Sequence, residues 1–229
     1  MLSLALAGKN ISHSRSKFVY EKLLNEEVDY YHYDCDASEL LPSLEEVFKS
    51  YKGLSITAPY KRHYLDRVSI DEEVRPLEAI NCIKKVEDGF QATNTDYMAL
   101  KEIFQKRISS HHSVVILGDG AMGKVTEHLF GVLKIPYKVF SRKKDDHFFD
   151  IDFGSLYSKE DKLFLINACS RKYFYNKSLA ENSVFYDYNY SSETQASYIQ
   201  SLNNVQYVDG MELLEGQALY ALKFWGIVE

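Results

Sequence analysis

The chain has 229 residues, of which 45% are hydrophobic, and a formal net charge of -6, as expected of a globular protein that buries one large core or two smaller ones. The acidic balance argues against the basic face of a duplex nucleic-acid binder, and no apolar run approaches the roughly 20 residues of a membrane helix. Three scattered cysteines (Cys35, Cys82 and Cys169) indicate reduced thiols in a cytoplasmic protein, and the seven histidines form no metal-binding pattern, so no metal is expected.

The first quarter of the chain alternates predicted strands and helices. In chain order these are an apolar strand over 2–7, a helix over 18–24, a strand over 31–35, a helix over 40–51 and a strand over 53–57. A β-α-β-α-β order favours parallel strands joined by helical crossovers. We therefore expect an α/β domain here.

A lysine follows the third of these strands. Pro59 fixes its own φ and suits the first position of a helix, so we expect Tyr60 and Lys61 to lie in an opening helical turn. Taken alone, a solvated surface lysine explains Lys61 at least as well as a functional residue does. Its role depends on whether the rest of the chain supplies a partner for it.

A polar segment follows a predicted β-hairpin. The hairpin has strands over 81–86 and 90–93, separated by a turn that ends in glycine. Asn94-Thr95-Asp96 then precedes a helix with one apolar face. The alternative to a functional role for Asp96 is that it caps this helix, which would begin at Tyr97.

A glycine-rich loop lies after an apolar strand over 114–117. Gly118, Gly120, Ala121 and Gly123 belong to a G-x-G-x-x-G pattern that precedes a predicted helix. Such glycines let the backbone approach a pyrophosphate, which the N–H groups of the helix N-terminus then bind. The alternative is a tight strand-to-helix turn without a ligand, but the strand and helix on either side favour a dinucleotide.

A basic run follows the next predicted strand, over 137–140. Ser141, Arg142 and Lys143 stand where a 2′-phosphate requires cations and where an NAD-binding fold usually has an acid. The run therefore favours NADP, although an ordinary basic turn has the same composition. Asp119, in the glycine loop, is expected to cost affinity unless it points away or is offset by Lys124.

The remaining strands indicate a compact second domain. Strands are predicted over 163–166, which leads into Asn167, and over 184–187. One poorly marked element fits between Arg142 and the first of them. We therefore expect fewer than the usual six strands of a dinucleotide-binding sheet.

Seven stretches, in this order and over nearly the whole chain, resemble motifs of the shikimate dehydrogenase family. They are Gly8–Ser16, Gly53–Lys61, Ala79–Asn81, Asn94–Asp96, Ser141–Lys143, Asp187–Tyr190 with Thr194, and Gly210–Gln217. The chain departs from the family pattern at several positions: Asn10 replaces proline, Ser55 asparagine, Glu78 glycine and Cys82 threonine, and Met211 is shifted by two positions.

The resemblance implies a two-domain α/β fold. It implies that residues 1–98, completed by 209–229, form a substrate-binding domain and that 99–208 form a compact Rossmann-type NADP-binding domain. A final helix would return to the first domain and carry Gln217. The partners implied are a small-molecule substrate and no nucleic acid or membrane, in a monomer or homodimer.

The resemblance also assigns roles to residues. It implies a catalytic pair of Lys61 and Asp96. It implies a substrate site made of Ser14, Ser16, Thr57, Asn81, Tyr190 and Gln217, and adds Asn167 and Gly210 to the cofactor site. Each residue has a simpler explanation: the serines could cap a helix, Asn81 could close a strand and Gln217 could be solvated.

The implied activity is the reversible reduction of 3-dehydroshikimate to shikimate with NADPH, on the pathway to chorismate and aromatic amino acids. One alternative is a quinate/shikimate-type dehydrogenase with another substrate preference. Another is a non-catalytic relative that binds NADP or a ligand, which the departures Asn10, Ser55, Glu78 and Asp119 would suit. Against it, Lys61 and Asp96 are both kept.

Overall fold

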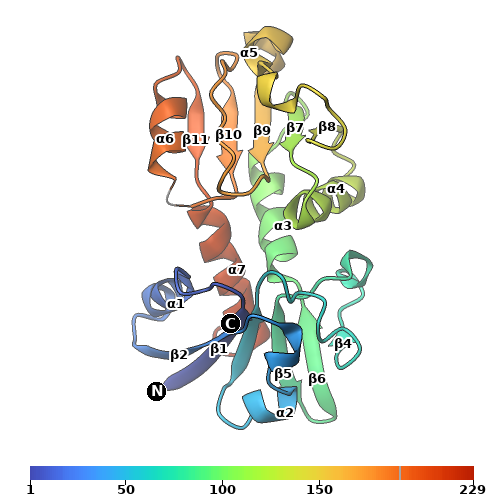
Figure 1. The fold of residues 1–229 in the computed structure, drawn as a ribbon, viewed down its shortest axis with the longest axis vertical. Coiled ribbons are helices and arrows are strands. Elements are labelled where there is room, and N and C mark those ends of the chain that lie inside the picture. The colour runs from blue at the N-terminus through green and yellow to red at the C-terminus, as the bar shows by residue number, and fades with distance from the viewer. Residues whose placement is uncertain (191) are drawn as a thin grey trace. The chain divides into compact units, whose positions relative to one another are not determined.

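The computed structural model describes residues 1–190 and 192–229 and divides into two compact units (Figure 1). The first comprises Met1–Ala99 with Leu214–Glu229, and the second Leu100–Leu213. Two helices, α3 (Thr95–Arg107) and α7 (Met211–Phe224), contribute residues to both units.

The first unit is built on a six-stranded sheet of order β2-β1-β3-β5-β6-β4. Its strands are β1 (Leu2–Gly8), β2 (Val28–Asp34), β3 (Gly53–Ile56), β4 (Ser69–Ile70), β5 (Cys82–Val86) and β6 (Gly89–Thr93). The first strand pairs in parallel with β2 and β3, which confirms the predicted parallel run. The predicted hairpin is also confirmed, since β5 and β6 pair in antiparallel fashion. The sheet is therefore mixed, because β5 runs antiparallel to β3.

Only the second helix of the first unit is shorter than the sequence predicted. Helix α1 spans Ser16–Leu24, but α2 spans only Leu44–Val47, and a 3₁₀ helix covers Ser38–Leu40. The prediction of one helix over 40–51 is wrong because a capping box starts α2 late. Ser43 Oγ accepts a hydrogen bond from Glu46 N, and Ser43 N donates to the Glu46 carboxylate.

The segment after β3 also differs from the prediction. No helix begins at Pro59, whose peptide bond with Ala58 is cis; consecutive turns follow instead. Tyr60 N donates to Thr57 O at 3.0 Å and His63 N donates to Tyr60 O at 2.9 Å, and these bonds close four-residue turns and are not α-helical bonds. Lys61 is therefore held in a turn, and no helix dipole acts on it from its own segment.

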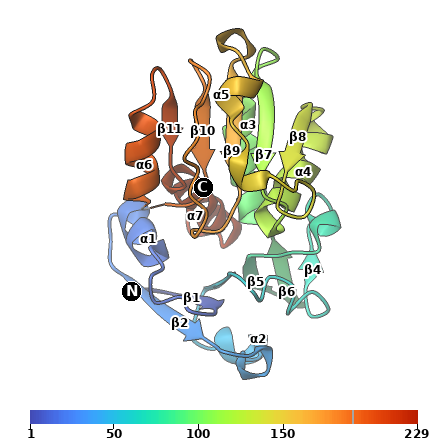
Figure 2. The same ribbon diagram turned by 45° about the horizontal axis from the view of Figure 1, so that its top comes forward.

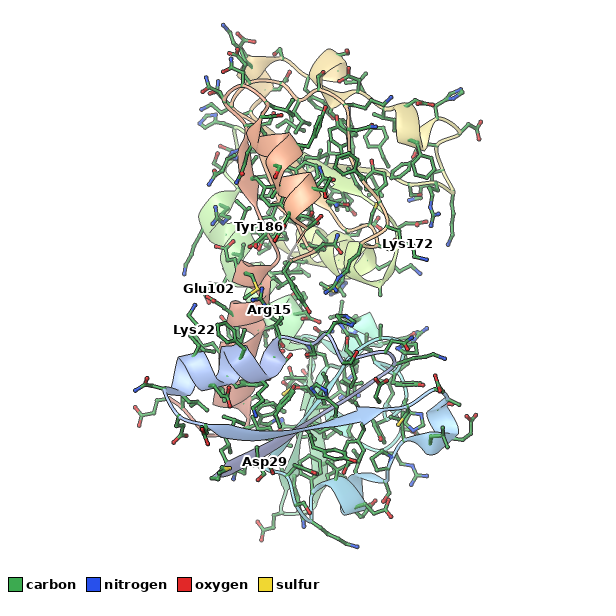
Figure 3. The ribbon with its side chains drawn as sticks, turned by 60° about the vertical axis from the view of Figure 1, so that its left-hand side comes forward. Arg15, Lys22, Asp29, Glu102, Lys172 and Tyr186 are labelled. Carbon is green, nitrogen blue, oxygen red and sulfur yellow. The ribbon has the colours of Figure 1, made fainter. Side chains whose placement is uncertain are left out.

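The C-terminal helix is anchored to the first unit by packing and by ion pairing. A Cβ added to Gly53 would lie 2.3 Å from the Trp225 ring, so only glycine lets the indole pack on β3. Trp225 Nε1 donates to Ile83 O at 2.9 Å. On α1, Lys22 (labelled in Figure 3) binds the Glu215 carboxylate at 2.6 Å. Helix α7 thus places Gln217 in the substrate-binding half of the predicted plan.

The second unit is a parallel five-stranded sheet, and Figure 2 shows its order β11-β10-β9-β7-β8. The strands are β7 (Ser113–Leu117), β8 (Tyr137–Phe140), β9 (Leu163–Asn167), β10 (Val184–Asp187) and β11 (Gln206–Val208). The helices are α4 (Ala121–Leu133), α5 (Phe153–Leu156) and α6 (Glu193–Gln200). Five strands confirm the expected compact sheet, although β11 and α6 were not predicted.

Helices and loops cover both faces of the second sheet. On one face, Val115, Leu117 and Leu165 pack in a core with Phe153 and Ile199. On the other face, aromatic side chains from α3, α4 and the sheet pack together. They are Phe104, Phe130, Phe164 and Tyr186. This two-sided burial explains why the central strands read as continuous apolar runs.

Candidate functional site

A largely buried ion pair of the first unit joins Lys61 and Asp96. Lys61 Nζ lies 2.6 Å from Asp96 Oδ2, and only 20% and 14% of the two side chains are exposed. The turn that carries the lysine is fixed by Ile80, whose N–H donates to Lys61 O at 2.8 Å. The lysine is therefore a partnered, largely buried group and not a solvated surface residue.

Asp96 is free of the capping role that was its simplest explanation. The N-cap of α3 is Asn94, whose Oδ1 accepts from Tyr97 N at 3.1 Å. Asn94 is fully buried, and its Nδ2 donates to Ala79 O at 2.9 Å. Asp96 lies in the first turn of α3, where the helix dipole favours a carboxylate. Its side chain is then available to Lys61.

A chain of polar contacts links Asn81 to Gln217. Asn81 Oδ1 accepts from both the N–H and the hydroxyl of Thr95, at 2.7 and 3.2 Å. The same hydroxyl lies 3.3 Å from Gln217 Oε1, and Gln217 Nε2 donates to Leu214 O. Three distant segments of sequence, around residues 81, 95 and 217, therefore meet beside the Lys61–Asp96 pair. Thr95 was not predicted as a site residue, although it is the middle residue of Asn94-Thr95-Asp96.

Thr57 directly follows β3, and Ser14 and Ser16 lie between the end of β1 and the first turn of α1. Ser14 Oγ donates to Ser16 Oγ at 3.1 Å and accepts from Ser16 N, the first N–H of α1, at 3.3 Å, while Arg15 at the N-cap position makes no side-chain cap. Thr57 N donates to Ala7 O at 2.9 Å, which fixes the two strand ends side by side. Ser14, Ser16 and Thr57 are all half-buried. Thr57 therefore lies at the carboxyl ends of β1 and β3, and the two serine hydroxyls contact each other.

Ser55, where asparagine was expected, makes a buried contact of its own. Its Oγ lies 3.3 Å from Tyr20 OH, and Ser55 is only 8% exposed. Burial raises the pKa of Tyr20 well above its usual value, so the phenol stays protonated. Tyr20 thus occupies space beside the shorter serine. Nothing in the sequence marked Tyr20, because it lies on a helix with ordinary apolar spacing.

Two other departures from the family pattern lie at unusual backbone positions. Asn10 has φ 55° and Glu78 has φ 46°, both in the left-handed region. Asparagine tolerates this region and proline is excluded from it, which explains why Asn10 is compatible with this loop. At Glu78, glycine would be the unstrained residue, and the glutamate instead forms an ion pair with Arg62.

In the second unit, the glycine loop lies at the point where strand order reverses. Strand β7 is flanked by β8 on one side and β9 on the other, so the carboxyl end of β7 is the switch point at which such sheets bind ligands. Gly118 follows β7 with φ 98°, a conformation that favours glycine. A Cβ added to Gly123 would lie 2.3 Å from Gly118 O. These two glycines therefore shape the loop.

The N-terminus of α4 is suited to a pyrophosphate. Gly120 is its N-cap, and a Cβ added there would meet nothing within 4 Å. Ala121 begins the helix, and the first N–H groups of a helix have no intrahelical acceptor. An open approach and free backbone donors fit the phosphates of a dinucleotide.

The basic run after β8 combines a buried hydroxyl with exposed cations. Ser141 is 1% exposed, and its Oγ has no hydrogen-bond partner among the described residues. Arg142 and Lys143 are exposed. Lys143 Nζ lies 4.0 Å from Asp119 Oδ2, so the cation that offsets Asp119 is Lys143, where the sequence had suggested Lys124.

Asn167 and Gly210 have structural contacts within the second unit. The Asn167 amide donates to Asp187 Oδ1 at 3.1 Å and accepts from Cys169 N, so both ends of it are engaged. A Cβ added to Gly210 would lie 2.4 Å from Tyr188 O. Tyr190 also belongs to this unit, where its ring lies 4.6 Å from the Arg171 guanidinium carbon. A role of these residues toward a ligand stays a prediction.

Asp187→Asn is expected to change how stability depends on pH. Burial raises the pKa of Asp187, so its contribution to stability is present below the pKa of the unfolded chain and is lost as pH rises through the folded pKa. Asparagine does not titrate, so the variant does not lose this stability as the pH rises. We expect the free energy of unfolding of the variant, relative to the wild type, to be higher at about pH 7 than at about pH 4.

Urea unfolding at the two pH values measures this difference. The altered hydrogen bond from Tyr207 OH to Asp187 Oδ2 affects the variant at both pH values, so the comparison between them isolates the charge. A variant that loses more stability near neutral pH than near pH 4 would contradict the prediction.

Comparison with known proteins gives the chain its family. A family model described as "Shikimate dehydrogenase substrate binding domain" matches residues 6–83. The shikimate dehydrogenase of Sulfurisphaera tokodaii is 24% identical over 97% of this chain and 88% of its own length. The shikimate dehydrogenase (NADP(+)) of Actinobacillus pleuropneumoniae serotype 5b is 30% identical over 76% of this chain and 72% of its own. This chain belongs to the shikimate dehydrogenase family.

Solved structures of shikimate dehydrogenases share the fold. Shikimate dehydrogenase 1 from Peptoclostridium difficile aligns over 100% of this chain and 93% of its own, with a TM-score of 0.75 and 24% identity. The enzyme from Thermus thermophilus, in complex with NADP(H) and shikimate, has a TM-score of 0.75 and 20% identity over 100% of this chain and 94% of its own. The predicted family and α/β fold class are confirmed.

Membership of the shikimate dehydrogenase family also confirms the predicted enzyme class, an oxidoreductase that acts on a CH–OH group. NADP, the predicted cofactor, is part of the name of several of these relatives. Within the described parts of the chain, no helix is long and apolar enough to cross a membrane, and no cluster of three or more metal-binding side chains is found.

Proposed function

We propose that this chain catalyses the reversible NADP-dependent reduction of 3-dehydroshikimate to shikimate. The first unit binds the acid and the second binds the cofactor. The observation that carries the proposal is the Lys61–Asp96 pair, with 2.6 Å between Nζ and Oδ2 and little exposure, beside the amides of Asn81 and Gln217. A hydroxy acid oxidised at one carbon needs one proton donor and acceptor and several groups that fix its orientation, and this arrangement supplies both.

Lys61 is the general acid of the proposed reduction. NADPH supplies the hydride when it is bound. As negative charge develops on the ketone oxygen, the Lys61 ammonium donates its proton to that oxygen. Asp96 orients the ammonium before the transfer through their hydrogen bond. The lysine side chain is 20% exposed, which allows it to regain a proton from water.

The substrate is proposed to bind to hydroxyl and amide groups. Such groups both donate and accept, which suits an acid that carries several hydroxyls. The set is Ser14, Ser16, Thr57, Asn81, Tyr190 and Gln217.

The cofactor is proposed to bind along the switch point of the second sheet. The loop Gly118–Gly123 and the N-terminus of α4 hold the pyrophosphate, and Asn167 and Gly210 complete the proposed cofactor site. The adenosine ribose and its 2′-phosphate are proposed to bind to Ser141, Arg142 and Lys143.

Product identification tests the reaction. Purified protein, NADP and shikimate are expected to give NADPH and 3-dehydroshikimate in equal amounts, as measured by absorbance and mass spectrometry. Quinate in a parallel reaction tests the alternative substrate, and we expect slower turnover. NADP binding without turnover of either acid would favour a non-catalytic role and overturn the proposal.

A further inference from the structure

The proposed ribose-binding end of the cofactor site has balanced charge. The run after β8 contains three cations, Arg142, Lys143 and Lys144, followed by Asp145 and Asp146, and Asp119 in the glycine loop adds a third carboxylate. A 2′-phosphate requires an excess of positive charge, whereas the free hydroxyls of NAD are well served by a carboxylate. The balance here therefore favours neither cofactor strongly.

Asp119 is the best-placed of these carboxylates to oppose a phosphate. Its Oδ2 lies 4.0 Å from Lys143 Nζ, and its side chain is 26% exposed where that of the lysine is 82% exposed. A more shielded charge is less screened by solvent. Asp119 thus pairs with Lys143, one of the cations that a 2′-phosphate would need.

The charges of Asp119 and Arg142 also act on the same cysteine, Cys169. Burial raises the pKa of the Cys169 thiol to about 12, Arg142 acts to lower it and Asp119 acts to raise it. A Cβ added to Gly118 would lie 3.1 Å from the Cys169 sulfur. Both charges therefore act on a thiol that packs against the glycine loop, and the field of Arg142 is partly cancelled there.

Asp145 accepts a hydrogen bond from a backbone N–H of the same run. Ser141 N donates to Asp145 Oδ2 at 2.7 Å, and the N–H groups of Lys144 and Asp145 turn back to Ser141 O. The main chain of this turn is therefore engaged in its own bonds. Ser141 Oγ, buried and without a partner among the described residues, is left as a neutral group that suits a ribose hydroxyl as well as a phosphate.

We infer that this chain binds NAD nearly as well as NADP, and that Asp119 is the residue that sets this weak preference. The inference rests on the proposed function, because it concerns the same cofactor site. Asp119 discriminates through charge: it repels the 2′-phosphate and holds Lys143 away from it.

Calorimetric titration of the full chain with NADP and with NAD tests the inference directly, without turnover. For the wild type we expect dissociation constants within about tenfold of each other. Asp119→Asn is expected to tighten NADP relative to NAD by about threefold to tenfold, the worth of a partly screened charge. Asp119→Ser should behave alike. Asp88→Asn, an equal charge change in an exposed turn of the first unit, should alter neither.

Two results would overturn the inference and leave the proposed function standing. One is a wild-type preference for NADP above about a hundredfold. The other is an unchanged ratio of the two dissociation constants in Asp119→Asn, with thermal unfolding showing that the variant is folded. Binding of neither dinucleotide would instead overturn the cofactor assignment itself, and the inference with it.

Discussion

Replacing Lys61 with alanine is expected to lower kcat by a factor on the order of 10²–10⁴, the usual contribution of a general acid. The variant loses the proton donor to the ketone oxygen and leaves Asp96 without its 2.6 Å partner. Affinity for NADP should remain near wild type, because the proposed cofactor residues belong to the second unit. Steady-state kinetics with shikimate and titration with NADP measure the two effects separately.

Lys52→Ala is the matched control. Lys52 is an exposed lysine of the same unit, so the variant has the same loss of charge without loss of the proposed acid. We expect kcat close to wild type for this control. A Lys61→Ala enzyme that also keeps near wild-type kcat would remove the lysine from the mechanism.

Gly123→Ala is expected to destabilise the second unit by about 1–3 kcal/mol, as overpacking usually does, and to weaken cofactor binding by at least about tenfold. The new Cβ would lie 2.3 Å from Gly118 O, a contact that forces the glycine loop to move. The loop backbone is what approaches the pyrophosphate in the proposed complex. Urea unfolding and titration with NADP give the two quantities.

Gly131→Ala, later in the same helix, is the matched control for this substitution. A Cβ added there meets nothing within 4 Å, and alanine favours a helix interior over glycine by up to about 1 kcal/mol. We expect equal or higher stability and unchanged cofactor affinity. If Gly123→Ala behaved like this control, the glycine loop would not be as tightly packed as its geometry indicates.

Much of the fold could be predicted because it follows from local pattern. The apolar run over 114–117 and the glycines after it identify a buried parallel strand and a phosphate-type turn within a few residues of sequence. The hairpin was predicted for the same reason, since alternating strands flank a glycine turn. The short strand β11 and helix α6 lack such signals and were missed.

The errors arise where tertiary contacts override local preference. Pro59 has the sequence context of a helix start, yet the hydrogen bonds of Tyr60 and His63 close four-residue turns there. Asp96 has the context of a cap, yet Asn94 fills that position because its amide also reaches Ala79 O. The bonds from Ile80 N to Lys61 O and from Asn94 to Ala79 O join segments that are distant in sequence, and periodicity carries no information about them.

The candidate site was predicted in its composition but not in its connections. The pairing of Lys61 with Asp96 was expected from the resemblance, and the structure places the two side chains in contact. The bridge from Asn81 to Gln217 through Thr95 and the contact of Tyr20 with Ser55 were not foreseen, because each depends on the packing of a helix against the sheet.

Transfer of deuterium tests the central claim most directly. Wild-type protein is mixed with 3-dehydroshikimate and NADPH that carries deuterium at the transferred position, and the product is analysed by mass spectrometry. The proposed function predicts shikimate with one deuterium at the former ketone carbon, formed rapidly by the wild type and far more slowly by Lys61→Ala. Absence of labelled shikimate, with NADPH bound to folded protein, would contradict it.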